Sequence, residues 1–256
     1  MTKHILLFVF ILSSFTATQA SELTTHYDSI YSLGNTAYQQ QKFDTALQSY
    51  MAIVESGLES TDLYFNIGNS YYKLNQPTQA ILYYEKALKL SPQGKDIQYN
   101  LSLANKLIVD KIETLPTPFY TEWWNGLVNS LSMDTFGNLS IAFIILAMFG
   151  LFVFLRTNTV MIKRTSFYLL IVFLLASGTT YLFANSQYNQ NFNTQHAIVF
   201  STRTNIYSAP NTTSTVLFVV HDGLKVKILK TEQQWMNIML PDGSIGWIPE
   251  EALVVI

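Results

Sequence analysis

The sequence predicts a multidomain membrane protein that combines all-α helical repeats, a two-helix transmembrane hairpin and a small all-β barrel. Three observations lead to this fold class. The residues around Gly34 recur 34 positions later, around Gly68. Two long apolar blocks without a charged residue follow, separated by a short basic segment. Short alternating runs with Asp-Gly turns then occupy the C-terminal region.

Composition excludes several classes of protein. Of the 256 residues 49% are apolar, and the formal net charge is only -2. Because the charges are scattered, no strong field exists to attract nucleic acid or an acidic substrate. The chain has no cysteine, which removes disulfides, thiolate nucleophiles and Cys-ligated zinc. Membrane segments account for the apolar excess.

Residues 1–20 are predicted to be a secretory signal peptide. Lys3 precedes an apolar run from Ile5 to Leu12, and a small-polar stretch ends at Ala20, a plausible processing site. An uncleaved anchor is the alternative, although the apolar run is shorter than the ~20 residues that a spanning helix needs. Either interpretation sends the following residues across the membrane.

The duplicated region predicts one helical hairpin in each unit. Gly34 aligns with Gly68, Ala46 with Ala80 and Tyr50 with Tyr84, and apolar residues recur at helical spacing in both units. Small residues are expected where two helices cross, because a larger side chain would hold the backbones apart.

This pattern resembles the tetratricopeptide (TPR) repeat, with units at 27–60 and 61–94. The second unit is close to the consensus, whereas the first departs from it at Ala37, Ile53 and Leu58. Two units cannot bury their own ends, so the amphipathic stretch from Ile97 to Ile108 is predicted to cap the stack. The predicted repeat domain covers 21–113.

The inner surface of the first helices is expected to bind an extended peptide. Asparagine can donate and accept hydrogen bonds, and tyrosine offers a flat contact area with a polar tip. The alternative is structural: the asparagines bridge neighbouring helices and the tyrosines pack. The expected register places these residues on that surface: Tyr31, Asn35, Tyr38, Phe65, Asn66, Asn69, Tyr72, Lys73, Asn100 and Lys106.

No catalytic constellation is predicted. Ser70 and Lys73 match the Ser-x-x-Lys signature of penicillin-binding enzymes, but the companion Ser-Asp-Asn and Lys-Thr-Gly motifs are missing from the sequence. His196 and His221 are isolated and lack metal-ligand or triad spacing. We therefore expect neither enzyme activity nor a cofactor or metal.

Residues 114–135, with Trp123 and Trp124, are predicted to form a helix at the membrane interface; a small core helix is the alternative. Spanning helices are predicted at 136–155 and 167–184, joined by a basic loop at 156–166. The positive-inside bias keeps this loop cytoplasmic, so the repeats and the C-terminal module share the periplasmic side of the inner membrane. No ionisable residue lies within either predicted span, which argues against a transport function.

A small-residue patch at 176–180 is expected to pack against Ala142, Ala147 or Gly150 of the first span, or against a helix of a partner. Intramolecular packing is the preferred interpretation.

After a linker at 185–195, residues 196–256 predict a small barrel. Strands are expected at 197–200, 215–220, 225–229, 235–240 and 246–248, with turns at Asp222-Gly223 and Asp242-Gly243. The turns and Gly246-Trp247-Ile248 resemble a bacterial SH3-like domain, in which Trp247 is expected to fill the barrel. Tyr207 and Trp235 are candidates for a platform that binds peptides or cell-wall stems; a structural role is the alternative.

The order of these segments resembles the E component of the Bat aerotolerance family. The resemblance covers nearly the whole mature chain and rests on residues 96–101, on Trp123-Trp124 and on 246–248. It implies a non-catalytic adaptor that works beside von Willebrand A-domain membrane proteins and a MoxR-type AAA ATPase in envelope or oxidative stress. Two other classes remain open: an envelope protein that binds peptidoglycan through its SH3-like domain, and an accessory subunit or cryptic hydrolase.

Overall fold

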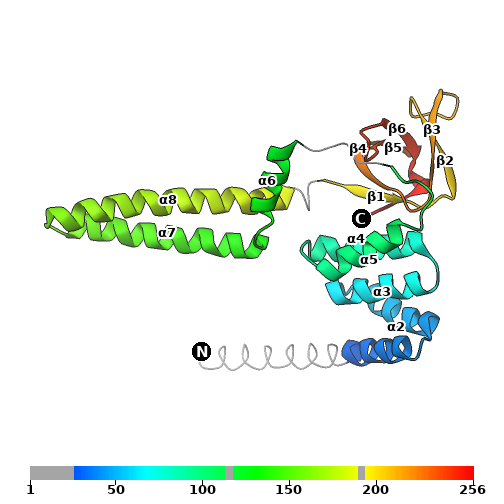
Figure 1. The fold of residues 1–256 in the computed structure, drawn as a ribbon, viewed down its shortest axis with the longest axis horizontal. Coiled ribbons are helices and arrows are strands. Elements are labelled where there is room, and N and C mark those ends of the chain that lie inside the picture. Colours follow the sequence, from blue (N-terminus) through cyan, green and yellow to red (C-terminus); the bar gives the residue numbers. More distant parts are fainter. Residues whose placement is uncertain (1–25, 113–117, 190–193) are drawn as a thin grey trace, which may run out of the picture. The chain divides into compact units, whose positions relative to one another are not determined.

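The computed structural model describes residues 26–112, 118–189 and 194–256 (Figure 1). The predicted signal peptide, including Ala20, lies outside the described residues. Within the described part, the chain forms two compact units. The first contains the helical repeats up to Lys111 together with residues 197–225 and 247–256, and the second contains residues 112–196 and 226–246.

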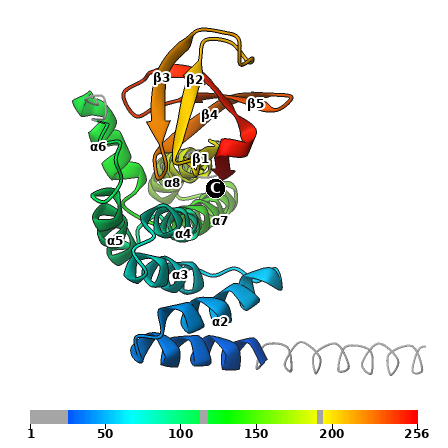
Figure 2. The ribbon, with the colours of Figure 1, turned by 90° about the vertical axis from the view of Figure 1, so that its right-hand side faces the viewer.

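The repeats consist of a helix covering residues 26–39 and of four further helices. These are α2 (Phe43–Glu55), α3 (Thr61–Lys73), α4 (Pro77–Leu90) and α5 (Lys95–Asn105). Figure 2 shows them stacked in chain order. The turns within the two hairpins also repeat, because Gln41 and Asn75 both adopt positive φ, at 60° and 58°. A left-handed residue ends a helix and lets the chain reverse.

The two glycines of the duplication lie where the helices of each hairpin cross. A Cβ on Gly34 would lie 2.5 Å from the ring of Tyr50, and a Cβ on Gly68 would lie 2.6 Å from the ring of Tyr84. Both tyrosines are only 1% exposed. The prediction that small residues permit the close crossing is therefore confirmed in both hairpins.

The predicted capping helix corresponds to α5, which packs against α4 and α3. Its buried residues Ile97 and Ala104 join the apolar core of the repeats, and Ile108, beyond the helix end, also packs against that core.

The two apolar blocks form a pair of long packed helices, α7 (Met133–Arg156) and α8 (Val160–Tyr188). With 24 and 29 residues and mean hydropathies of 2.5 and 1.9, both are long and apolar enough to cross a bilayer. The helices are longer than the predicted apolar spans. In particular, Lys163 and Arg164 lie inside α8 and not in a loop, because both residue types extend a helix readily.

The contact between α7 and α8 is centred on two buried serines. The Ser140 and Ser177 hydroxyls lie 3.1 Å apart, and each also donates to the backbone carbonyl of the other residue. The predicted small-residue patch thus packs within the chain, through Ser177 against Ser140. Gly150, one of the expected partners, instead lies beside Ser166 and Leu170: a Cβ placed on it would lie 3.5 Å from the Ser166 carbonyl oxygen.

Helix α6 (Phe119–Val128) packs on α8 in the second unit. Trp124 meets Phe183 edge-on at 5.5 Å between ring centroids, and Gln187 donates from Nε2 to the carbonyls of Val128 and Leu131. Val128 is the buried residue of α6, and the aromatic side chains of its first turns are exposed. Exposed aromatic residues are typical of a helix at the membrane interface.

The C-terminal region is an antiparallel seven-stranded sheet with the order β3-β2-β6-β5-β4-β1-β7. The strands are β1 (His196–Val199), β2 (Arg203–Tyr207), β3 (Val216–His221), β4 (Lys225–Glu232), β5 (Trp235–Met239), β6 (Ile245–Pro249) and β7 (Leu253–Val255). Gly223 and Gly243 adopt φ of 89° and 84°, as the Asp-Gly turns predict.

One expectation for this module was wrong. Trp247 does not fill the core; it is half-buried and alternates along β6 with the buried residues Gly246 and Ile248. Because successive side chains of a strand point to opposite faces, the inward positions belong to Gly246 and Ile248. Fully buried aliphatic residues, among them Ile206, Ile238 and Ile248, form the core.

Candidate functional site: the groove of the helical repeats

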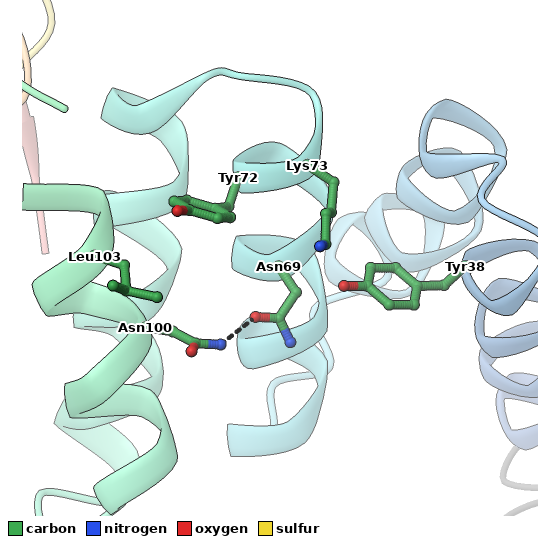
Figure 3. A pocket seen from close by; sticks show the side chains of 6 residues that line it. All are labelled: Tyr38, Asn69, Tyr72, Lys73, Asn100 and Leu103. Atoms are coloured by element: carbon green, nitrogen blue, oxygen red, sulfur yellow. Dashed lines mark hydrogen bonds between the residues drawn. The ribbon is translucent and has the colours of Figure 1, made fainter.

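A pocket of about 280 Å³ lies along the first helices of the repeats (Figure 3). It is lined by Tyr38, Asn69, Tyr72, Lys73, Asn100 and Leu103. Tyr38 comes from the first helix, Asn69 to Lys73 come from α3, and Asn100 and Leu103 come from α5. Five of the predicted groove residues therefore meet at one pocket.

The asparagines of this surface belong to a hydrogen-bond network that occurs twice. The Oδ1 atom of Asn69 accepts from the Tyr84 hydroxyl at 2.8 Å and from Nδ2 of Asn100 at 2.8 Å. In the preceding unit, the Oδ1 atom of Asn35 accepts from the Tyr50 hydroxyl at 2.7 Å and from Nδ2 of Asn66 at 3.2 Å. Each network joins three helices, so these asparagines help to set the spacing of the stack.

Burial strengthens the preference of these tyrosines for the protonated form. It raises the pKa of Tyr50 to about 12 and also raises the pKa of Tyr84 well above its ordinary value of 10.0. Both hydroxyls donate to asparagine oxygens, and they keep their protons even in moderately alkaline solution. The network supports the structural interpretation for the oxygens of Asn35 and Asn69 and for the nitrogens of Asn66 and Asn100.

The amide nitrogen of Asn69 is the chemically useful part of its side chain. A primary amide carries two N–H donors, and Oδ1 of Asn69 is already used by two partners. Figure 3 shows the Asn69 nitrogen on the side of its amide away from Asn100. The exposed ammonium group of Lys73 and the half-buried rings of Tyr38 and Tyr72 complete the pocket. Such a surface suits a ligand that presents carbonyl or carboxylate oxygens.

Five predicted residues lie outside the pocket lining: Tyr31, Asn35, Phe65, Asn66 and Lys106. The Phe65 ring packs beside the ring of Tyr84, at 6.0 Å between centroids. Asn35 and Asn66 bond to each other, and Nδ2 of Asn66 also donates to the Tyr31 hydroxyl at 2.8 Å. Lys106 is the exposed C-cap residue of α5. Leu103 is a pocket residue that the sequence did not predict, because α5 lacks the second helix that would have completed a recognisable repeat.

The two predicted aromatic residues of the β module are both half-buried. Tyr207 in β2 lies opposite Trp247 in β6. Trp235 begins β5, and β6 lies between β2 and β5 in the sheet order. The strands that carry the two residues are therefore not adjacent.

Within the described residues, no group of three or more His, Asp or Glu side chains could hold a metal ion. The pocket presents amide donors, one cation and aromatic walls.

The fold combines a stack of helical repeats, which carries the polar pocket, with a small β module. Comparison with protein families supports this combination: the tetratricopeptide repeat family matches residues 61–93, and the bacterial SH3 domain family matches residues 201–254. No curated protein gives a significant match to the chain. Both matched families are binding modules, which indicates a role in protein interaction and gives no sign of a catalytic domain.

Proposed function

We propose that the protein is a non-catalytic adaptor, anchored in the bacterial inner membrane, that holds an extended segment of a partner protein in the groove of its helical repeats. The pocket between Tyr38, Asn69, Lys73 and Asn100 carries this proposal. Its donors stand on a rigid network of buried tyrosines and asparagines, so the groove is ordered before the ligand arrives. A preorganised site loses less entropy on binding.

Two features support a periplasmic location for the groove. Arg156 ends α7, and Lys163 and Arg164 lie near the start of α8, so all three flank the short connection at 157–159; positive residues beside such short connections favour the cytoplasmic side. The segments before and after the helix pair contribute to one compact unit, which requires an even number of membrane crossings between them. Together these features favour a periplasmic groove.

The chemistry of the pocket favours a peptide as its ligand. An extended backbone presents carbonyl oxygens that the Asn69 amide can bind, and an acidic side chain or a C-terminal carboxylate can pair with Lys73. The resemblance to the E component of the Bat family makes von Willebrand A-domain membrane proteins the candidate partners.

The SH3-like module supplies a second contact in this proposal, through Tyr207 and Trp235. Two weak contacts on one chain raise the effective affinity when both can be made together. A second candidate function, binding of peptidoglycan through this module, is favoured by the match to the bacterial SH3 domain family.

Copurification from the native membrane in mild detergent tests the proposal. The change Tyr72→Ala with Lys73→Glu alters the pocket without touching the hydrogen bonds of Asn69. The matched control, Lys95→Glu, makes the same charge change at an exposed residue of α5 outside the pocket lining. We expect a von Willebrand A-domain protein with the parent and the control, and its loss with the groove variant.

Equal recovery with all three proteins would contradict the groove proposal. Retention of the parent on isolated peptidoglycan, abolished by Trp235→Ala and unaffected by the groove variant, would transfer the binding function to the SH3-like module.

A further inference from the structure

The helical stack ends in half a repeat. Asn100 in α5 stands 34 residues after Asn66, and it bonds to Asn69 as Asn66 bonds to Asn35. Helix α5 therefore occupies the place of the first helix of a third repeat. The position that would correspond to Tyr84 is Pro118, which precedes α6. No second helix of a third repeat follows α5 before the chain leaves this unit after Lys111.

The side of α4 that would face a further helix of the stack carries buried polar residues, whereas the equivalent side of α2 packs against the next repeat. Met51 in α2 accepts a contact from the Tyr83 hydroxyl of the next repeat, at 3.2 Å. The equivalent position in α4 is Glu85, 34 residues later, and its side chain is bound by Lys225 Nζ of β4 at 2.6 Å. A segment of the β module thus meets α4 where the next helix of a stack would be.

Three further polar contacts join the same segments of the first unit. The Thr78 hydroxyl of α4 donates to Asp222 Oδ2 at 2.6 Å, and Lys89 Nζ donates to the Ile256 carbonyl at 2.8 Å. Asp110, just beyond α5, accepts from the backbone N–H of His221 at 2.6 Å. Thr78 and Glu85 are 4% and 9% exposed, so their partners satisfy groups that are otherwise removed from water.

Apolar contacts accompany these bonds. Ile198 of β1 is fully buried in the same cluster as Ala80 and Ala87 of α4, and Val254 and Ile256 pack against it. A Cβ on Gly223 would collide with Ile108, so the β3–β4 turn approaches the end of the stack closely. Buried apolar area with satisfied polar groups is typical of a permanent interface.

We infer that the β module completes the third repeat: its β3–β4 turn and its C-terminal strand take the place of the missing helix and cap the stack. The two membrane helices are then an insertion within one discontinuous domain. The parts of this domain that precede and follow the insertion meet where Asp110 binds His221. The capping contacts lie on α4 and beyond α5, so the groove lined by α3 and α5 stays accessible. The turn at Asp222–Lys225 is occupied by the chain itself and does not bind an external ligand.

Cysteine pairs in the full-length protein test this inference, because the chain has no cysteine of its own. Thr78→Cys with Asp222→Cys is treated with a short thiol cross-linker in intact membranes. In the control pair, Asn211→Cys replaces Asp222→Cys. Asn211 lies in the connection between β2 and β3, at the opposite end of β3 from Asp222. Strand β3 alone, from Val216 to His221, spans ~17 Å, so Asn211 is far from Asp222. We expect an intramolecular product only with the first pair; equal products from both pairs, or none, would overturn the inference.

Charge reversal at Lys225 or Glu85, added to the protein that carries Thr78→Cys and Asp222→Cys, gives a second readout. It distinguishes docking of the β module on α4 from folding of the chain as a whole. Lys225→Glu or Glu85→Lys alone places like charges together and should lower the rate of cross-linking several-fold. The combination of both reversals restores opposite charges and should recover most of the rate. Failure of the combination to recover it, or no effect of the single changes, would refute the assignment of this ion pair to the cap.

Discussion

The change Gly68→Ala should loosen the second hairpin, although alanine is the better helix former. The added Cβ would lie 2.6 Å from the ring of Tyr84, which is 1% exposed and cannot move into solvent. The Tyr84 hydroxyl is also held by Asn69, and Phe65 lies beside the ring at 6.0 Å between centroids. The ring can give way only by breaking that hydrogen bond or by separating α3 from α4.

The magnitude follows from opposing terms. Overpacking of a well-packed core costs about 1–3 kcal/mol, and the strained hydrogen bond adds about 1 kcal/mol. The higher helix propensity of alanine returns about 1 kcal/mol. A net loss of about 1–3 kcal/mol corresponds to a factor of about 5–150 in the local opening equilibrium.

Hydrogen exchange of the full-length protein in mild detergent measures this opening segment by segment. We expect faster exchange of core amides in α3 and α4 for Gly68→Ala, and in α2 and residues 26–39 for Gly34→Ala. Gly126→Ala is the control, since nothing lies within 4 Å of a Cβ placed there. Unchanged protection of α3 and α4 in Gly68→Ala would refute the steric reasoning.

Three further predictions concern the buried tyrosines of the repeats and the contacts of α8. Because burial raises the pKa of Tyr50 to about 12, the unfolded chain loses this proton at a lower pH than the folded chain does. The free energy of unfolding should therefore fall between about pH 10 and 12, by ~1.4 kcal/mol per pH unit. Thermal unfolding across this range measures the decrease, and a flat profile would contradict it. Gln187→Leu removes the donor to two carbonyls at the end of α6 and should cost about 1–3 kcal/mol. Exchange should then rise in α6 before α7, and simultaneous loosening of both would argue against this local role. Ser177→Ile should separate α7 from α8 and lower the unfolding temperature in detergent. Ser177→Ala should have only a small effect on stability, about 0.6 kcal/mol. Equal decreases in unfolding temperature for the two variants would contradict the close contact at Ser140.

The duplication was readable from sequence because a close helix crossing leaves few choices. Only a very small residue fits against the ring of Tyr50 or Tyr84, so the glycine spacing predicted both hairpins. The two apolar helices were equally clear from length and composition.

The missed elements have weak local signals. Strand β2 reads Arg-Thr-Asn-Ile-Tyr, and only Ile206 in it is buried, so it lacks the alternation that marks a strand. Strand β7 has only three residues. The start of α8 was missed because Lys163 and Arg164 interrupt the apolar run but not the helix.

The roles of the groove residues could be predicted only in part. Periodicity places Asn69 and Asn100 on one surface, but it cannot show that the Asn69 oxygen is bound by Tyr84 from the opposite helix. Tyr72 and Lys73, which line the pocket outside that network, are therefore the better positions for test variants.

Site-specific photo-cross-linking from the groove tests the central proposal most directly. A photoreactive amino acid replaces Tyr72 in the full-length protein, and the same amino acid at Lys95 serves as the control. After illumination of intact cells, we expect a covalent product with a von Willebrand A-domain membrane protein from position 72 only, and its loss when Lys73→Glu is added. No product from position 72, or the same product from both positions, would contradict a partner held in the repeat groove.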